Sequence, residues 1–253
     1  MAPYPTPGFS LASHGDRVNC PLRPLVRLAL PRHRCRMHNR RARLEGKYAI
    51  HHAIPAGNGG CVIVRDDADR GFLMREIRRE VLERGWLLIA FCVMDTHVHL
   101  LIETPEPDLS AGIGRIQGRY ARRFNKRHGS HGALFQQRYW SRRIDSAGYL
   151  VRVAVYVALN RVKPQICAHP SEWSWSSYRE TAGLEPPSGL LDLSRLYAML
   201  GRDEDEARRT YFALVEEGLA RMREGEDPAW EAAGDLVDNR FGQDTRRARV
   251  TPG

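Results

Sequence analysis

Two apolar segments joined by a short polar turn restrict how this chain can fold. Only Asp95 and Thr96 separate the apolar run Trp86 to Met94 from a second apolar run, His97 to Glu103. A connection of two residues joins neighbouring antiparallel strands. The pattern therefore predicts a β-hairpin within an antiparallel sheet.

Segments with helical or extended character surround this hairpin. Apolar residues recur at helical spacing from Ala68 to Arg84, behind a capping Asp66 or Asp67 and before Gly85. Two more helices are expected at Leu109 to His128 and at Ser146 to Asn160, strands at Lys47 to Ile54 and Cys61 to Val64, and a loop or short strand at Phe135 to Ile144. This order predicts an α+β domain, a small antiparallel sheet with helices packed on one face.

The two ends of the chain differ from this central part. Residues 1–42 are rich in Pro, Arg and His without periodicity, and we expect a basic, disordered leader there. Two helical segments, Leu190 to Leu200 and Asp203 to Arg221, predict a C-terminal helical extension over residues 183–222. Residues 223–253 are expected to form a polar, flexible tail.

Apolar runs and cysteines bear on where the protein acts. No run approaches the roughly 18 apolar residues of a transmembrane helix, so no membrane partner is expected. The five cysteines include no CxxC pair, which argues against a disulfide framework and a zinc knuckle. A reducing cytoplasm is the expected location.

The net charge of the chain is +9, and a strongly basic segment lies in its middle. No Asp or Glu occurs between Ser110 and Ile144. A basic segment of this kind suits a polyanion such as nucleic acid, although a solvated basic face would have the same composition. The basic side chains of the segment are Arg115, Arg119, Arg122, Arg123, Lys126, Arg127, Arg138, Arg142 and Arg143.

Two histidines in the second strand of the hairpin are candidate metal ligands. His97 and His99 are two positions apart, so on a strand their side chains point to the same face. Two imidazoles side by side can bind one metal ion. The alternative is that they are ordinary surface or buried histidines.

Polar side chains share one face of the predicted helix from Ser146 to Asn160. Tyr149, Tyr156, Asn160 and Lys163 recur at spacings of three, four and seven residues. Such a face beside a histidine pair would suit a site that handles phosphate. The alternative is that the tyrosines pack their rings in the core and hydrogen-bond their hydroxyls.

Taken together, these motifs resemble the single-tyrosine HUH transposases, named for a His-hydrophobic-His motif, and most closely the REP-associated tyrosine transposases of bacteria. The resemblance covers residues 41–182 in order. Besides His97-Val-His99, it rests on Arg119-Tyr-Ala-Arg-Arg-Phe-Asn-Lys-Arg127, Leu134-Phe-Gln-Gln-Arg-Tyr139, Tyr156-Val-Ala-Leu-Asn-Arg161 and Trp173-Ser-Trp-Ser-Ser-Tyr178.

The resemblance implies a ferredoxin-like domain over residues 43–182 that cuts and rejoins single-stranded DNA. Tyr156 would be the nucleophile that forms a 5′-phosphotyrosine intermediate. His97, His99 and Asn160 would hold a divalent ion, Mg²⁺ or Mn²⁺. The basic residues listed above and Lys163 would contact single-stranded or hairpin DNA in the nucleoid. Both a monomer and a homodimer are compatible with it.

The chain departs from the family pattern at two places. Asp95-Thr96 stands where a pair such as Pro-Asn is commoner, and Asn160-Arg161 stands where Asn-Pro is usual. The second departure leaves open a catalytically inactive or domesticated regulatory protein that binds hairpin DNA. A metal-dependent phosphodiesterase that activates water is a third alternative.

Overall fold

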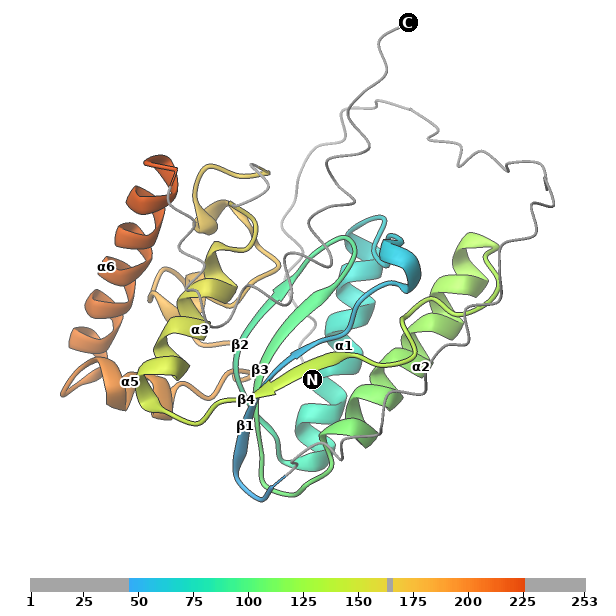
Figure 1. The fold of residues 1–253 in the computed structure, drawn as a ribbon, viewed down its shortest axis with the longest axis horizontal. Coiled ribbons are helices and arrows are strands. Elements are labelled where there is room, and N and C mark those ends of the chain that lie inside the picture. Colours follow the sequence, from blue (N-terminus) through green and yellow to red (C-terminus); the bar gives the residue numbers. More distant parts are fainter. Residues whose placement is uncertain (1–45, 163–165, 226–253) are drawn as a thin grey trace, which may run out of the picture. The chain divides into compact units, whose positions relative to one another are not determined.

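The computed structural model describes residues 46–162 and 166–225, which contain one four-stranded antiparallel sheet (Figure 1). The strands are β1 (Ala49–Ile54), β2 (Leu87–Val93), β3 (Val98–Thr104) and β4 (Trp140–Arg143), in the spatial order β2-β3-β1-β4. The antiparallel sheet and the α+β class confirm the fold predicted from the sequence.

The predicted hairpin is formed by β2 and β3. Val93 pairs with Val98, and the backbone N–H of Met94 donates to the carbonyl of His97 at 2.9 Å. Strand β3 also pairs along its other edge with β1, from Ala49 opposite Thr104 to Ala53 opposite Leu100. Because β3 has a neighbour on each side, its backbone hydrogen bonds are made within the sheet.

Helices α1 (Asp67–Arg84) and α2 (Leu109–His128) cover one face of the sheet. The apolar stripes of these helices, with Leu73, Ile77, Ile113 and Ile116, share a buried core with Leu100 on β3 and its neighbours on that face. The caps of α1 are the predicted ones. The Asp66 side chain accepts from the backbone N–H of Asp69, and Gly85 ends the helix with a left-handed φ of 63°.

Helix α3 (Ala147–Leu159) lies against the opposite face (Figure 1). The helices therefore cover both faces of the sheet, and the prediction that they pack on one face was wrong. Helix α3 packs on β2 and β3 and is covered in turn by α5 (Ser194–Leu200) and α6 (Glu204–Arg223). A helix enclosed in this way needs apolar residues all round. Both predicted helical segments of the C-terminal extension are present, and α6 runs to Arg223.

Shorter elements complete the fold, and one predicted strand is absent. The 3₁₀ turns Asn58–Gly60 and Pro170–Glu172 and the short helix α4 (Tyr178–Thr181) connect the larger elements. Residues Cys61 to Val64 form no strand, so that prediction was wrong. Ile63 and Val64 instead donate their backbone N–H groups to the carbonyl of Asp95, at 2.7 and 3.1 Å.

Three predictions fall on residues that the structure does not describe. They are the leader over residues 1–42, the part of the predicted tail from residue 226 to 253, and the placement of Lys163. Within the described ranges, no helix is both long and apolar enough to cross a membrane.

Two glycines on α2 provide a test of the contact between α2 and Trp86, the residue directly before β2. A Cβ at Gly112 would overlap the ring of the buried Trp86, whereas a Cβ at Gly114 would meet nothing within 4 Å. We expect Gly112→Ala to lower the free energy of unfolding by about 1–3 kcal/mol through overpacking. Gly114→Ala should raise it by about 0.5–1 kcal/mol because alanine is the better helix former. Urea denaturation measures both, and equal effects would contradict the close approach.

Candidate active site

Three imidazole rings meet on the face of the sheet that α3 covers. His52 on β1 lies opposite Leu101 on β3, so its side chain shares a face with His99, two residues away from Leu101. The Nε2 atom of His52 is 3.0 Å from Nδ1 of His99, and Nε2 of His99 is 3.0 Å from Nε2 of His97. His52 and His99 are fully buried.

Neighbouring side chains fix how the two predicted ligands are turned. Nδ1 of His97 lies 2.9 Å from Oγ1 of Thr96, and Nδ1 of His99 faces His52. The Nε2 atoms therefore face each other. Two nitrogens bound at right angles to one ion at about 2.1 Å lie roughly 3 Å apart, so this pair suits a shared cation. Among the described residues, no group of three or more His, Cys, Asp and Glu side chains forms a metal site.

Tyr156 on α3 packs against these imidazoles. Its ring centroid is 5.6 Å from that of His99 and 6.0 Å from that of His52, both edge-on, and the residue is 2% exposed. The helix brings the phenol here because α3 crosses the sheet directly over β2 and β3. The structure thus brings together the tyrosine and the histidines that the sequence analysis singled out.

Asn160 lies one helical turn after Tyr156, at the end of α3. Its side-chain Nδ2 donates to the Tyr156 carbonyl at 2.9 Å, and the residue is 4% exposed. This bond is made by the NH₂ group and holds the amide against the last turn of the helix. A cation would be bound by the other atom of the amide, the carbonyl oxygen.

Tyr149, the other tyrosine of the predicted face, has a different setting. The guanidinium groups of Arg142 and Arg152 lie 4.8 and 5.7 Å from its ring centroid. Its hydroxyl is buried without a hydrogen-bond partner, and burial raises the pKa of this phenol. Tyr149 therefore packs beneath basic side chains, two turns before Tyr156.

His52 is the site residue that the sequence analysis missed. The ring is packed edge-on against Trp140 of the edge strand, with centroids 5.5 Å apart. Burial, with a smaller effect from the neighbouring His97, lowers the pKa of His52 to about 3. Adjacent histidines at positions 51 and 52 of a predicted strand place one ring on each face. That signal was available, but only the pairing of β1 with β3 shows which ring reaches His99.

Two of the predicted DNA contacts on α2 are tied to α1 by ion pairs. Arg119 Nη1 lies 2.7 Å from Oε1 of the fully buried Glu80. Arg127 lies 2.7 Å from Asp66, and this hydrogen bond lowers the pKa of the Asp66 carboxyl to about 2. These two arginines therefore stabilise the contact between the helices.

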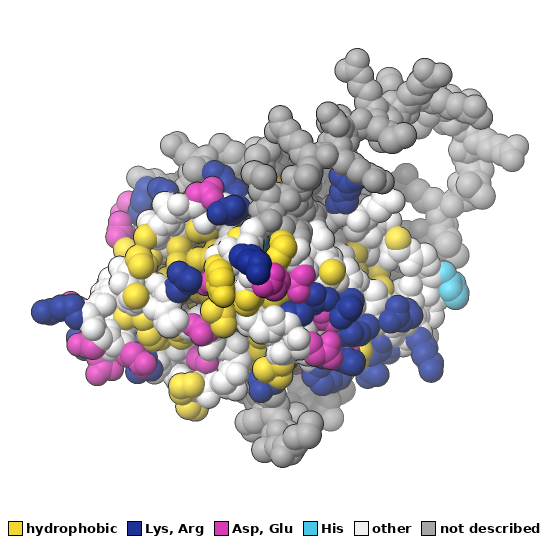
Figure 2. All heavy atoms as spheres, turned by 90° about the horizontal axis from the view of Figure 1, so that it is seen from below, with side chains coloured by type: hydrophobic (Ala, Val, Ile, Leu, Met, Phe, Trp, Pro, Cys, Tyr) yellow, Lys and Arg dark blue, Asp and Glu magenta, His cyan; other side chains and the backbone are white. Residues whose placement is uncertain are grey.

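The other predicted contacts within the described residues are exposed. Lys and Arg side chains gather over the side of the molecule where α1 and α2 lie (Figure 2). The basic side chains of α2 are on the sheet face opposite Tyr156. Strand β4 is at the edge of the sheet, beside β1. The exposed residues are Arg115, Arg122, Arg123 and Lys126 on α2, with Arg138, Arg142 and Arg143 on and before β4.

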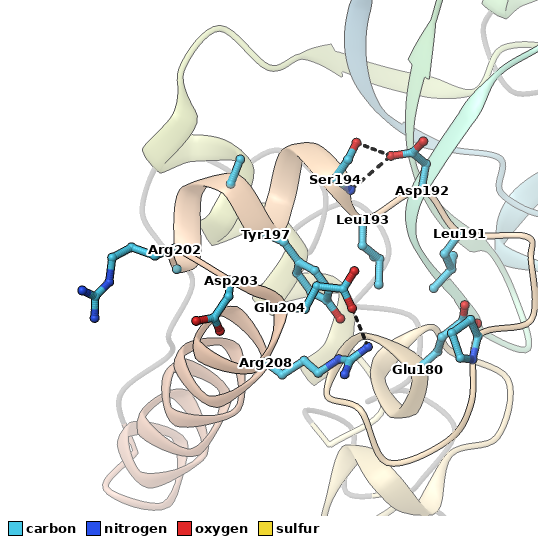
Figure 3. A pocket seen from close by; sticks show the side chains of 13 residues that line it. Glu180, Leu191, Asp192, Leu193, Ser194, Tyr197, Arg202, Asp203, Glu204 and Arg208 are labelled. Carbon is cyan, nitrogen blue, oxygen red and sulfur yellow. Dashed lines mark hydrogen bonds and ion pairs between the residues drawn. The ribbon is translucent and has the colours of Figure 1, made fainter.

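A pocket of about 500 Å³ lies beside α5 and α6 (Figure 3). Its lining includes Glu180, Asp192, Asp203 and Glu204, against Arg202 and Arg208, and Arg208 is paired with Glu204 at 3.0 Å. This excess of carboxylates repels a phosphate backbone. The pocket is thus unsuited to nucleic acid and shares no lining residue with the histidine cluster.

Several known proteins are similar to this part of the chain. Residues 62–160 match the family model described as transposase IS200 like, and this range includes His97, His99, Tyr156 and Asn160. The matched segment is similar to the IS200-like transposases and spans less than half of the chain. A Haemophilus influenzae protein classed as a REP-associated tyrosine transposase is 26% identical over 108 residues, 38% of this chain. The alignment spans 61% of that relative's length.

One solved structure has the same fold as this part of the chain. A REP-associated tyrosine transposase bound to a REP hairpin superposes with a TM-score of 0.50 at 19% identity, over 62% of this chain and 90% of the other. A Deinococcus radiodurans protein classed as a transposase gives a TM-score of 0.34 at 23% identity, over 41% and 85%.

The ion pairs of α2 separate structural arginines from accessible ones. Arg119→Gln removes a charged partner from the buried Glu80, and we expect a loss of about 1–3 kcal/mol in the free energy of unfolding. Arg122→Gln, one turn further along α2 and exposed, should change it by less than about 0.5 kcal/mol. Thermal and urea denaturation of the two variants measure this difference. Indistinguishable stabilities would contradict the structural role of Arg119.

Proposed function

We propose that this chain is a DNA transposase that cuts and joins single-stranded DNA through a covalent tyrosine intermediate. The observation that carries the proposal is the contact of Tyr156 with His99, whose Nε2 faces Nε2 of His97. A phenol beside two potential cation ligands is what transfer of a phosphoryl group to tyrosine requires. The proposed domain is the one expected over residues 43–182, and the matched residues 62–160 lie inside it.

In the proposed reaction, Tyr156 is the nucleophile. Its hydroxyl oxygen forms a bond to the scissile phosphorus and loses its proton, while the bond from phosphorus to the 3′ oxygen breaks and that oxygen takes up a proton. The products are a 5′-phosphotyrosine and a free 3′-OH. Because one phosphodiester replaces another, the reverse attack by a 3′-OH rejoins a strand without ATP.

His97, His99 and Asn160 are the residues that would hold a divalent ion, Mg²⁺ or Mn²⁺. Such an ion, when bound, polarises a phosphate oxygen and stabilises the charge that develops on it. The role of the chain is to hold the two imidazoles in one orientation, with Thr96 behind His97 and His52 behind His99. Burial of His99 and Tyr156 keeps water away from the phenol.

Hairpin DNA with a single-stranded flank is the proposed partner. The solved relative with the same fold is bound to a REP hairpin, and the exposed cations of α2 and β4 offer this chain a comparable polyanion surface. On β4, Arg142 lies opposite His52 and therefore on the same face as the site. We propose that α2 holds the hairpin backbone and that Arg142 contacts the strand that reaches Tyr156.

Trapping of the covalent intermediate tests this function. The probe is a pool of hairpin oligonucleotides with randomised single-stranded flanks, labelled at the 3′ end and incubated with Mg²⁺ or Mn²⁺. A labelled protein–DNA adduct should appear on a denaturing gel for the unaltered chain and for Tyr149→Phe. It should be absent for Tyr156→Phe, which removes only the attacking oxygen, while binding of the pool is retained.

Two results would reject this assignment. An adduct that survives Tyr156→Phe would place the nucleophile elsewhere. Binding of hairpins by the unaltered chain, with neither cleavage nor adduct, would support the regulatory protein considered from the sequence. Cleavage without an adduct would support the phosphodiesterase.

His52 gives a test of the metal site that does not depend on activity. A histidine ligand whose other nitrogen is held by a neighbouring group keeps its coordinating nitrogen aimed at the ion, and loss of such a neighbour commonly weakens metal binding about 10- to 100-fold. We expect His52→Phe to weaken Mn²⁺ binding by that amount and His52→Gln to weaken it less, because glutamine can still accept a hydrogen bond. Titration followed by electron paramagnetic resonance measures the affinity, and equal affinities in all three proteins would exclude this role.

A further inference from the structure

A buried arginine joins the two elements that carry the proposed site. The guanidinium of Arg161 binds both carboxylate oxygens of Asp95, with Nη1 3.2 Å from Oδ2 and Nη2 3.1 Å from Oδ1. The Arg161 side chain is 3% exposed, and its guanidinium carbon lies 3.7 Å from the centroid of the Trp173 ring. Two hydrogen bonds and a stacking contact fix the group in one orientation.

Asp95 and Arg161 are each close in sequence to residues of the proposed site. Asp95 lies in the turn between β2 and β3, two residues before His97. Arg161 directly follows Asn160 and is five residues after Tyr156. The ion pair therefore connects the turn that leads into the histidines with the end of the helix that carries the phenol.

Asp95 is itself held from other directions. Its carbonyl accepts from the backbone N–H groups of Ile63 and Val64, and its Oδ1 accepts from Arg70 on α1 at 2.7 Å. Burial raises the pKa of the Asp95 carboxyl, but hydrogen bonds and charge from Arg161 and Arg70 outweigh it, so that the pKa is lowered. These contacts hold the turn in place, so Arg161 can fix the end of α3 to it.

Stability alone is a poor explanation for this arrangement. Removing a guanidinium from water is costly. The Asp95 side chain is 40% exposed, so solvent screens the attraction that would offset this cost. The Nε atom of Arg161 is also buried without a hydrogen-bond partner, so the burial of this cation is only partly compensated. The Arg161–Asp95 pair therefore contributes little stability, but its two directional hydrogen bonds can hold the end of α3 in a fixed position.

We propose that Arg161 and Asp95 are positioning residues that set the distance between Tyr156 and the imidazoles of His97 and His99. This inference rests on the proposed function. The two places where the chain departs from the family pattern, the turn at Asp95 and the residue after Asn160, meet in this one contact. In this chain the ion pair fixes the end of α3, at the position where the resembled family usually has proline.

The chain offers a matched control for the test. Arg70 binds the same carboxylate and also lies over Trp173, 5.1 Å from its ring centroid, but it belongs to α1 and not to the segment that follows α3. Arg70→Gln and Arg161→Gln each remove one cation from Asp95. Only Arg161→Gln releases the end of α3.

The first measurement is the single-turnover rate of adduct formation with the 3′-labelled hairpin pool at saturating concentration. We expect Arg161→Gln and Asp95→Asn each to slow it by about 10- to 100-fold, since small displacements of reacting groups have effects of this size. The affinity for the pool should stay within about twofold, and Arg70→Gln should react at nearly the unaltered rate. Asp95→Asn added to Arg161→Gln should slow the reaction little further, because both substitutions remove one contact.

The second measurement, amide hydrogen exchange, needs no reaction. Exchange over residues 157–162 and 95–99 should accelerate together in Arg161→Gln and in Asp95→Asn, whereas Arg70→Gln should leave residues 157–162 unchanged. If the unaltered chain forms no adduct, the proposed function fails and the exchange result still decides the role of the pair. If Arg161→Gln matches Arg70→Gln in both rate and exchange, the inference is overturned. Asp95→Asn, which preserves side-chain volume, serves the same purpose if Arg161→Gln does not fold.

Discussion

Burial of β3 on both faces is the constraint on which the rest of the molecule depends. All seven residues from Val98 to Thr104 are buried, because α1 and α2 cover one face and α3 covers the other. A strand in this position is expected to be apolar throughout, and each polar side chain in it needs a partner. His99 meets two other imidazoles, and Glu103 is paired with Arg195 of α5 at 2.8 Å. The candidate site is thus built into the most enclosed strand of the domain.

Local patterns made much of this fold predictable. The hairpin, both caps of α1 and the bounds of α2 follow from residues that are neighbours in sequence, and turn and capping preferences act over such short ranges. The shared face of His97 and His99 follows from the alternation of a strand. The segment Cys61 to Val64 was misassigned because its apolar residues serve a turn contact with Asp95 and pair with no strand.

Features that depend on distant segments could not be obtained in this way. His52 reaches His99 only because β1 pairs with β3, which no local pattern specifies. The acid-free segment from Ser110 to Ile144 suggested nine available cations. The acids that bind Arg119 and Arg127 lie on α1 and at its N-cap, earlier in the chain. Asp95 and Arg161 likewise lie far apart in the sequence, and no local pattern shows that these two departures from the family pattern contact each other. The roles of Tyr156, His97, His99 and Asn160 remain predictions. The structure shows Tyr156 beside His99, His99 beside His97, and Asn160 bonded to the Tyr156 carbonyl.

The enclosed position of α3 bears on what the C-terminal helices are for. The outer side of α3 is covered by Leu196 and Leu200 of α5 and by Tyr211, Val215 and Leu219 of α6. At the closest approach to α6, a side chain larger than that of Gly218 would collide with Leu159. A chain cut at residue 183 would present this apolar side of α3 to solvent, a surface of the kind that drives aggregation. The C-terminal helices are therefore an integral wall of the domain, and a soluble minimal fragment has to retain them.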